Sequence, residues 1–457
     1  MSKLPSAGVC AGAWSRRAVL TSGLLAAGGL FVAGCERERP VIESEDYVDS
    51  ASSMRNRLRD ILDRQAQAVL DRDEEAYLAD LDQSNQQLIE QEKRVFANLR
   101  QFDFADFRHI LDQTSEEKQD DGTTVFRPVI RVIKLTADEG PGDVAPAEMF
   151  LYRVREQDDK LVVTEIVGAT EDNHESLNLT EPFAEAPWYT DRLRVVNVNG
   201  KVWLVGDETV DDLDDYAAVA ERELAVVEDL WGDRTKFPGH VLFFTRDRSN
   251  FHDWFGVGRT ETFDPDVLGL QIPLLGVRKD GILYRDQFVA SRIVVNLASI
   301  EAKNTEPRIT IRHELTHAVT ARAELTVGFT RPPIWAIEGF ARYSETVGNP
   351  ERANWILAIV ADGVRAGKFT GEPPASKGFY EDSGFNYCLG ASVFILAERL
   401  KGRDAAVELY ASIIKRPDPL DVSFFDLPIF DGIARRVLGM SGDAFQSRWA
   451  SFVRSGA

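Results

Sequence analysis

Apolar positions recur at helical spacing in the first part of the chain and then begin to alternate. Across residues 47–99 they return every three or four positions, which predicts amphipathic helices. Gly- and Asp-rich breaks then separate β-branched or alternating runs, which predict strands at residues 107–111, 125–135, 149–155 and 161–167. Helices followed by an antiparallel meander predict an α+β domain.

A second pattern begins after the acidic, proline-containing segment 171–187, which predicts a linker. Asn199-Gly200 between two alternating runs predicts a β-hairpin. The other expected elements are helices at residues 211–231, at 309–323 and from 334 onward, strands at 241–245 and 292–297, and helical packing from 405 to 452.

Composition sets limits on the class of protein. With 457 residues, the chain is too long for one compact core and is expected to form two or three domains. Its 44% hydrophobic and 28% charged residues fit a folded globular protein. The net charge of −21 argues against a nucleic-acid partner, because phosphate backbones need a basic face.

The N-terminus is typical of an export signal. Basic residues precede an apolar run of small residues at 18–34, and Arg16-Arg17 is similar to a twin-arginine motif, with general secretion as the alternative route. The segment 32–35, Val-Ala-Gly-Cys, resembles the lipobox of bacterial lipoproteins; an ordinary cleavage site is the alternative. We predict a lipoprotein signal peptide at residues 1–35 and a polar tether at 36–46. A lipid on Cys35 would anchor the protein on the extracytoplasmic face of the bacterial cell membrane.

Cysteine usage excludes a structural disulfide within the mature chain. Cys10 leaves with the signal and Cys35 would carry the lipid. Cys388 stands in an apolar stretch, which predicts a buried core position.

The strongest chemical signal is the pentapeptide His-Glu-Leu-Thr-His at residues 313–317. On a helix, His313 and His317 lie one turn apart and point the same way, so both imidazoles can bind one metal ion. Glu314 stands beside them, placed to take a proton from a zinc-bound water. Glu338 on the following helix would complete a His₂Glu site for one Zn²⁺ per chain, with an open fourth position.

At these residues the chain resembles the gluzincin clan of zinc peptidases, over roughly residues 285–400. The second helix matches the pattern W-x-x-E-G-x-A/T-x-Y-x-E of the aminopeptidase-like branch at Trp335, Glu338, Gly339, Ala341, Tyr343 and Glu345. In that branch a later Y-x-x-G supplies a Tyr that stabilises the tetrahedral intermediate. The resemblance implies this role for Tyr387, and a Tyr that only packs is the alternative.

Two departures from the gluzincin pattern bear on function. The G-x-M-E-N segment that binds the free amine in aminopeptidases has no counterpart, because none of the four Met residues precedes Glu-Asn. This absence favours an endopeptidase. Arg342 stands where thermolysin-type enzymes carry an Asp that orients a ligating His, and Glu345 is the candidate for that supporting carboxylate.

The helices and strands at residues 47–187 resemble the NTF2-like cone fold, which implies an NTF2-like α+β domain. Its lone His109 is expected to be structural. Residues 188–457 would then form a thermolysin/aminopeptidase-like zinc peptidase domain. This order resembles bacterial secreted lipoproteins of the peptidase MA-like group, in which the first domain would serve as a spacer or present the substrate.

We therefore expect a surface-anchored zinc peptidase that acts on peptides or proteins. The alternative is a non-catalytic, metal-stabilised lipoprotein that binds a partner through its N-terminal domain; the base Glu314 favours the enzyme. Hydrolysis of a non-peptide amide or ester is a third reading. Residues 292–297 are expected to form an edge strand that pairs with the substrate, with Asn296 either in contact with substrate or merely at the strand terminus.

Overall fold

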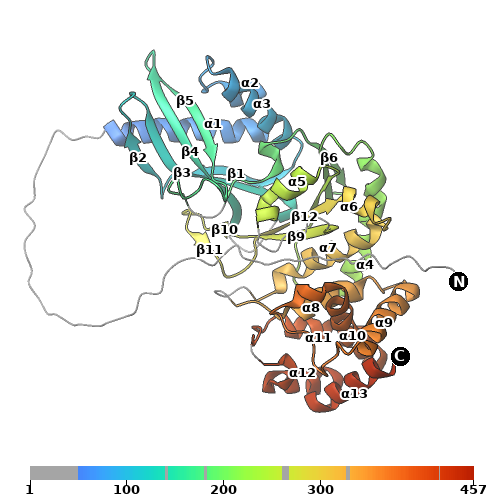
Figure 1. The fold of residues 1–457 in the computed structure, drawn as a ribbon. Coiled ribbons are helices and arrows are strands. Elements are labelled where there is room, and N and C mark those ends of the chain that lie inside the picture. Colours follow the sequence, from blue (N-terminus) through green and yellow to red (C-terminus); the bar gives the residue numbers. More distant parts are fainter. Residues whose placement is uncertain are drawn as a thin grey trace, which may run out of the picture.

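The computed structural model describes residues 50–138, 143–179, 183–259, 267–325, 330–420 and 422–456, which form three stacked lobes (Figure 1). The N-terminal lobe combines helices with an antiparallel sheet. The central lobe holds a five-stranded sheet and helices, and the helical lobe carries the helices from residue 334 onward. This mixed content fits the predicted α+β class. The predicted signal peptide, the tether and Cys35 lie outside the described residues.

In the N-terminal lobe, helices precede the sheet, as the apolar spacing predicted. The elements are α1 Ser50–Asp71, α2 Glu74–Leu78, α3 Gln86–Leu99, β1 Phe104–Ile110, β2 Ser115–Lys118, β3 Thr124–Leu135, β4 Ala145–Gln157 and β5 Lys160–Gly168. The strand order is β1-β3-β4, with β2 on β3 and β5 on β4, and every pair is antiparallel. Membership of the NTF2-like family stays a prediction.

The interior of this lobe holds polar groups around Arg131. Its Nη2 donates to the Tyr152 hydroxyl at 2.7 Å, and its Nε donates to His109 Nε2 at 3.2 Å. His109 Nδ1 lies 3.2 Å from a main-chain carbonyl oxygen, so both ring nitrogens are engaged, and burial lowers the pKa of this imidazole. Burial also raises the pKa of Glu148 to about 7, although Tyr189 donates a hydrogen bond to its carboxylate. These contacts fit a structural role for His109.

The central sheet runs in the order β6 Arg194–Val198, β7 Val202–Gly206, β8 His240–Thr245, β12 Ala290–Asn296 and β9 Gly269–Leu274. The three inner strands are parallel, and β6 and β9 are antiparallel at the two edges. Asn199 and Gly200 both have positive φ and make the predicted turn. The prediction that residues 292–297 form an edge strand is wrong, because β9 adds to β12 and becomes the edge.

Side chains of the inner strands alternate between two hydrophobic cores. On β8, Leu242 and Phe244 face a core that continues into the helical lobe, whereas Val241 and Phe243 face a core shared with the N-terminal lobe. Burial on both faces explains why these strands are continuously apolar. Trp188 belongs to the second core, so the packing continues across the predicted domain boundary at residue 187.

Two contacts fasten the N-terminal sheet to the central sheet. Strand β10 Gly276–Val277 follows β9 and pairs both with β4 and with β11 Leu283–Tyr284. Arg292 on β12 forms a buried ion pair with Asp138, with nitrogen–oxygen distances of 2.6 and 2.7 Å. Both contacts join segments far apart in the sequence.

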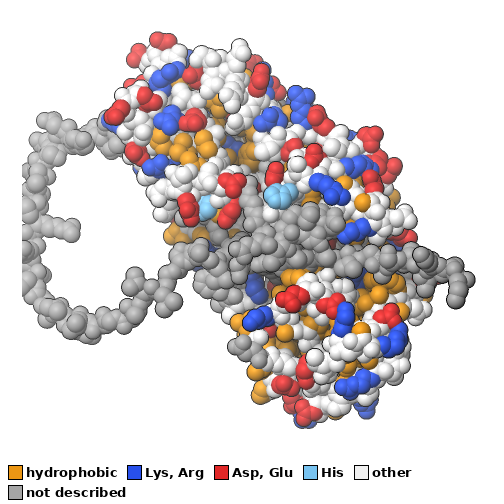
Figure 2. Space-filling model, in the orientation of Figure 1, with side chains coloured by type: hydrophobic (Ala, Val, Ile, Leu, Met, Phe, Trp, Pro, Cys, Tyr) orange, Lys and Arg blue, Asp and Glu red, His pale blue; other side chains and the backbone are white. Residues whose placement is uncertain are grey.

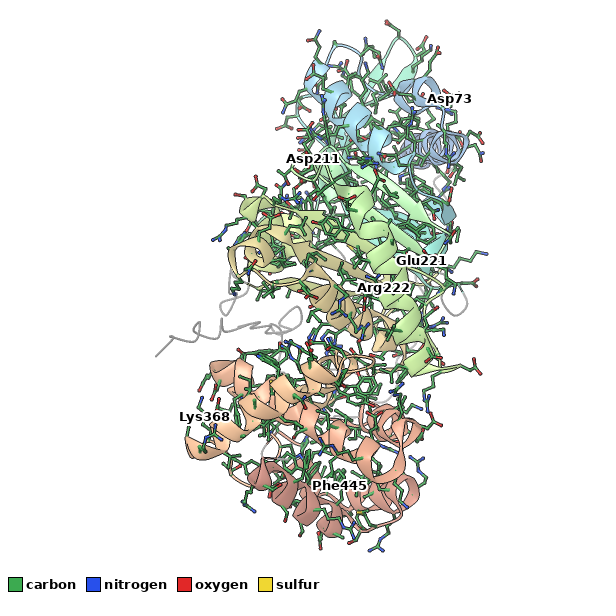
Figure 3. All side chains as sticks on the ribbon, turned by 90° about the vertical axis from the view of Figure 1, so that its right-hand side faces the viewer. Asp73, Asp211, Glu221, Arg222, Lys368 and Phe445 are labelled. Carbon is green, nitrogen blue, oxygen red and sulfur yellow. The ribbon has the colours of Figure 1, made fainter. Side chains whose placement is uncertain are left out.

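The remaining helices lie in the central and helical lobes. They are α4 Ala217–Trp231, α5 Arg248–Asp253, α6 Leu297–Ala302, α7 Pro307–Thr320, α8 Ile334–Ser344, α9 Pro350–Arg365, α10 Ser383–Lys401, α11 Arg403–Ile413, α12 Pro428–Leu438 and α13 Gly442–Ser455. In Figure 3, α4, which carries the labels Glu221 and Arg222, runs along the central lobe toward the helical lobe. Cys388 lies buried in α10, as predicted.

Asn296 ends strand β12 and caps the next helix. Its side chain accepts a hydrogen bond from the main-chain nitrogen of Ser299 at 3.0 Å, and it is 1% exposed. This position agrees with a strand terminus and not with a substrate contact.

The surface mixes charges of both signs. Figure 2 shows acidic and basic side chains interspersed on the face in view. In the part of the chain that the structure describes, no helix combines the length and apolar character that a membrane crossing needs.

Candidate active site

Two helices bring the predicted metal ligands together. Helix α7 carries His313 and His317 one turn apart, and α8, which starts after Pro333, returns Glu338 to them. Nε2 of His313 lies 3.3 Å and Nε2 of His317 lies 3.2 Å from the same Glu338 Oε2. All three side chains are buried, and their ligand atoms lie within 4.8 Å of one another. Two imidazole nitrogens and one carboxylate oxygen are a donor set that catalytic zinc sites use.

The electrostatics of this group favour a bound cation. Burial alone would raise the pKa of Glu338, but His317 and His313 hold it well below its usual range. Burial would lower the pKa of His313, yet hydrogen bonds to Glu338 and Glu345 raise it to about 9. The carboxylates therefore favour positive charge on His313, and a divalent cation bound by the group would supply that charge with this ring neutral.

Glu345 lies behind His313, where the sequence predicted a supporting carboxylate. Its Oε1 is 2.9 Å from His313 Nδ1. Arg342 Nη1 donates to both carboxylate oxygens at 2.9 and 3.0 Å, and Arg352 Nε donates to Oε2 at 2.7 Å. A partner at Nδ1 fixes the tautomer and turns Nε2 toward the shared centre.

Glu314 lies against the edge strand β9. The main-chain N–H of Gln271 donates to its carboxylate. A Cβ on Gly269 would stand 3.1 Å from Glu314 Cγ and 2.7 Å from Thr310 Cγ2, so the glycine allows the strand to approach α7 closely. Burial raises the pKa of Glu314, although the two imidazoles lower it. A carboxyl group with a raised pKa is suited to take up and return a proton near neutral pH.

Arg312, next to His313 in the sequence, ties α7 to its neighbours. It forms a buried ion pair with Glu223 of α4 and donates to the Val347 carbonyl oxygen at 2.7 Å, just beyond α8. The distance between the two ligand-bearing helices therefore depends partly on this side chain.

Helix α10 crosses α8 at a pair of glycines. A Cβ on Gly339 would stand 2.5 Å from the carbonyl carbon of Gly390, and one on Gly390 would stand 2.5 Å from the Trp335 carbonyl oxygen. This close crossing places Tyr387 beside His313, with the rings stacked and their centroids 5.8 Å apart. Gly390 is the glycine of the Y-x-x-G pattern. Because it has no side chain, the helix that carries Tyr387 can approach α8 and the predicted ligands closely.

A second tyrosine borders the same centre. Tyr380, in the short 3₁₀ helix Phe379–Asp382, has its hydroxyl 3.5 Å from Glu338 Oε1. Burial raises the pKa of Tyr387 well above its ordinary value, so that this hydroxyl keeps its proton at neutral pH.

Comparisons with known proteins yield matches among solved structures. No family model and no curated protein matches the chain. A two-domain M1 zinc metallopeptidase mutant with bound L-tryptophan is 13% identical, with a TM-score of 0.31 over 67% of this chain and 61% of that one. An M1 zinc metallopeptidase from Deinococcus radiodurans is also 13% identical, with a TM-score of 0.31 over 69% of this chain and 62% of that one. Both neighbours are zinc metallopeptidases. The chain spans about three fifths of their length.

Four of the predicted residues, His313, Glu314, Glu345 and Tyr387, line a cavity of about 680 Å³. His313, Glu314 and Tyr387 line it together with the start of β9 and with Arg352 and Trp355 of α9. The side chains of His313 and Glu338 are each 11% exposed and that of His317 is 7% exposed, so the centre is recessed but open.

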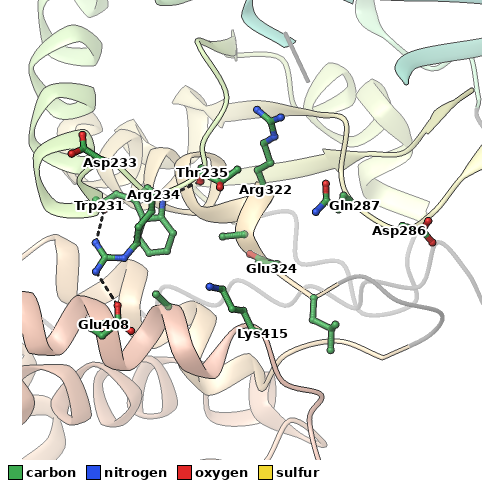
Figure 4. Close-up of a pocket in the computed structure, with 13 residues that line it drawn as sticks. Trp231, Asp233, Arg234, Thr235, Asp286, Gln287, Arg322, Glu324, Glu408 and Lys415 are labelled. Atoms are coloured by element: carbon green, nitrogen blue, oxygen red, sulfur yellow. Dashed lines mark hydrogen bonds and ion pairs between the residues drawn. The ribbon is translucent and has the colours of Figure 1, made fainter. Parts of the chain in front are cut away.

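A second cavity, of about 620 Å³, lies beyond the C-terminal end of α7 (Figure 4). Arg234 and Glu408 form an ion pair at 3.1 Å across it, and Arg234 also donates to the Trp231 carbonyl oxygen at 2.8 Å. None of the predicted site residues lines it, and its charges are of both signs.

Sequence reasoning missed β9 and the residues that tertiary packing adds to the site. A signal for β9 was present, because Leu268, Leu270, Ile272 and Leu274 alternate and Pro273 is typical of an edge strand. Tyr380 and Arg352 lie on separate elements, and no spacing rule connects them to the histidines.

Proposed function

We propose that this protein is a zinc-dependent hydrolase that cleaves peptide bonds. The convergence of His313 Nε2, His317 Nε2 and Glu338 Oε2 within 4.8 Å, beside the buried carboxylate Glu314, carries the proposal. A purely structural metal site needs no base and closes its fourth position. A base and an adjoining cavity support the enzyme over a metal-stabilised binding protein.

The donor set fits one zinc ion per chain, held by His313, His317 and Glu338. When bound, zinc supplies the Lewis acidity that activates water at neutral pH and polarises a carbonyl group. Glu345 holds His313 in the tautomer that leaves Nε2 available as a ligand.

Glu314 acts as general base and then as general acid. Its carboxylate takes a proton from the attacking water and delivers it to the leaving nitrogen of the peptide. The N–H of Gln271 orients the carboxylate of Glu314. The raised pKa of Glu314 brings its protonated and ionised forms closer in energy at neutral pH.

Tyr387 donates a hydrogen bond to the oxygen on which negative charge develops. Its ring stacks on that of His313 and its hydroxyl keeps its proton at neutral pH, which supports this role. A fixed donor of this kind stabilises the charge without reorganisation.

The substrate is an extended peptide that pairs with strand β9. Among the described residues, β9 has a partner strand only on its β12 side, and the start of β9 lines the cavity, which leaves that end of the strand for pairing with an extended peptide. The missing G-x-M-E-N segment favours internal cleavage over release of N-terminal residues.

The enzyme works as a lipoprotein on the extracytoplasmic face of the bacterial membrane, anchored through Cys35. The lipobox-like segment 32–35 supports this location. Replacement of Cys35 by Ala is expected to release the protein into the soluble fraction, as measured by fractionation and blotting. Unchanged membrane retention would count against lipidation at this cysteine.

Peptide cleavage by wild type and Glu314→Gln tests the proposed function. A broad peptide library, incubated with each purified protein and read by mass spectrometry, should show internal cleavage by wild type. We expect a loss of about a thousandfold or more in the variant, because the base is removed while the ligands stay. Equal cleavage by both proteins, or none by a zinc-loaded wild type, would refute it.

A further inference from the structure

The cavity wall beyond the histidines carries two arginines on a single carboxylate. Arg342 of α8 makes bonds of 2.9 and 3.0 Å to Glu345, and Arg352 of α9 contributes Nε at 2.7 Å and Nη2 at 2.6 Å. Both arginines line the cavity that contains His313 and Glu314. Two guanidinium groups against one carboxylate leave one positive charge in excess.

The rest of the lining carries charges of both signs. Glu314 belongs to the catalytic group. The remaining charged residues of the lining are two cations and two carboxylates, namely Lys303, Arg308, Glu306 and Glu351. Arg308 and Glu306 pair with each other at 3.1 Å. With Glu314 the lining holds four cations and four carboxylates in all, so its positive charge is local to the two arginines over Glu345.

Arg352 keeps donor capacity for a ligand. Its Nε and Nη2 bind Glu345, whereas its Nη1 has no hydrogen-bond partner among the described residues. Its guanidinium carbon lies 4.0 Å from the ring centroid of Trp355, which is 38% exposed. An arginine held over an aromatic ring is preorganised to bind a carboxylate.

We propose that Arg352, backed by Arg342 and Trp355, binds a carboxylate group of the substrate near the scissile bond. This inference rests on the proposed peptidase function and names the substrate class, peptides that present a carboxylate to this wall. The carboxylate is supplied either by an Asp or Glu side chain or by the C-terminus of the peptide.

Matched peptides distinguish the two sources. Peptides from the cleaved library are resynthesised with Glu, Gln or Lys at each position near the cleavage site, and with a free or amidated C-terminus. Wild type should favour the carboxylate form over its amide by about 10- to 100-fold in kcat/KM, the scale of a charge-assisted hydrogen bond. A preference for Glu over Gln assigns the side chain, and a preference for the free over the amidated end assigns the C-terminus.

Arg352→Gln should abolish the preference, mainly through KM, while its zinc content stays at the wild-type level because Arg342 still holds Glu345. Arg352→Lys keeps the charge and should keep part of the preference. Arg435→Gln, on an exposed ion pair of α12, is the matched control and should behave as wild type.

Cleavage by wild type without a carboxylate preference, or a preference that survives in Arg352→Gln, overturns the inference but not the peptidase function. Failure of wild type to cleave any peptide overturns both.

Discussion

Gly269 is the residue at which the edge strand β9 meets helix α7. Replacement by Ala would put a Cβ 2.7 Å from Thr310 Cγ2 and 3.1 Å from Glu314 Cγ. We expect kcat/KM to fall by about 10- to 100-fold, because a small displacement of the base misplaces the proton transfer. Zinc content should not change.

The control for this variant is Gly432→Ala in α12, where a Cβ meets nothing within 4 Å. Steady-state kinetics on a cleaved library peptide compares the two variants. Wild-type kcat/KM in Gly269→Ala would show that β9 does not set the position of Glu314.

The sequence could predict those site residues whose positions follow from their spacing along a helix. His313 and His317 are one helical turn apart on α7, Glu338 lies on α8 and Glu345 caps the C-terminal end of α8, and the structure brings all four together. Gln271 reaches Glu314 only because β9 docks on α7, a contact between distant segments that no local pattern encodes.

At the scale of elements, the Arg292–Asp138 ion pair couples strand β12 to the N-terminal lobe. Asp138→Asn would leave a buried guanidinium opposite a neutral side chain. We expect the free energy of unfolding to fall by about 3–5 kcal/mol, the usual cost of breaking a buried pair from one side. Urea denaturation followed by circular dichroism measures it.

An exposed pair supplies the comparison. Asp362 pairs with Arg365 on α9, with side chains 65% and 70% exposed. Asp362→Asn should cost less than about 1 kcal/mol. If Asp138→Asn costs no more than this control, the pair does not fasten the lobes.

The elements themselves were predicted unevenly. The Asn-Gly hairpin, the inner strands and helices α7 and α8 have strong local signals, and the structure contains them. The short strands β2, β10 and β11 have two to four residues each and depend on partner strands for their existence. The same dependence explains why the sequence wrongly predicted an edge strand at residues 292–297. The position of a strand in a sheet is set by its neighbours, and β9 was not predicted.

For the whole molecule, the buried carboxyl of Glu148 makes stability depend on pH. Burial raises its pKa from 4.5 to about 7. Because the folded state holds the proton more tightly than the unfolded chain, this contribution is fully present below pH 4.5 and is lost as the pH rises through about 7. The loss is roughly 3 kcal/mol.

Glu148→Gln should remove that dependence and be more stable than wild type above neutral pH. Urea unfolding of both proteins at several pH values between about 5 and about 8 measures the difference. Parallel pH profiles for the two proteins would mean that Glu148 does not titrate in the folded state.

Zinc content per chain, measured by mass spectrometry on the purified protein and matched variants, tests the central claim most directly. Wild type and Glu314→Gln should each bind about one zinc, because the base is not a ligand, whereas Glu338→Gln should lose most of it. Zinc-free wild type, or a Glu338→Gln variant that retains as much zinc as wild type, would contradict the His₂Glu centre.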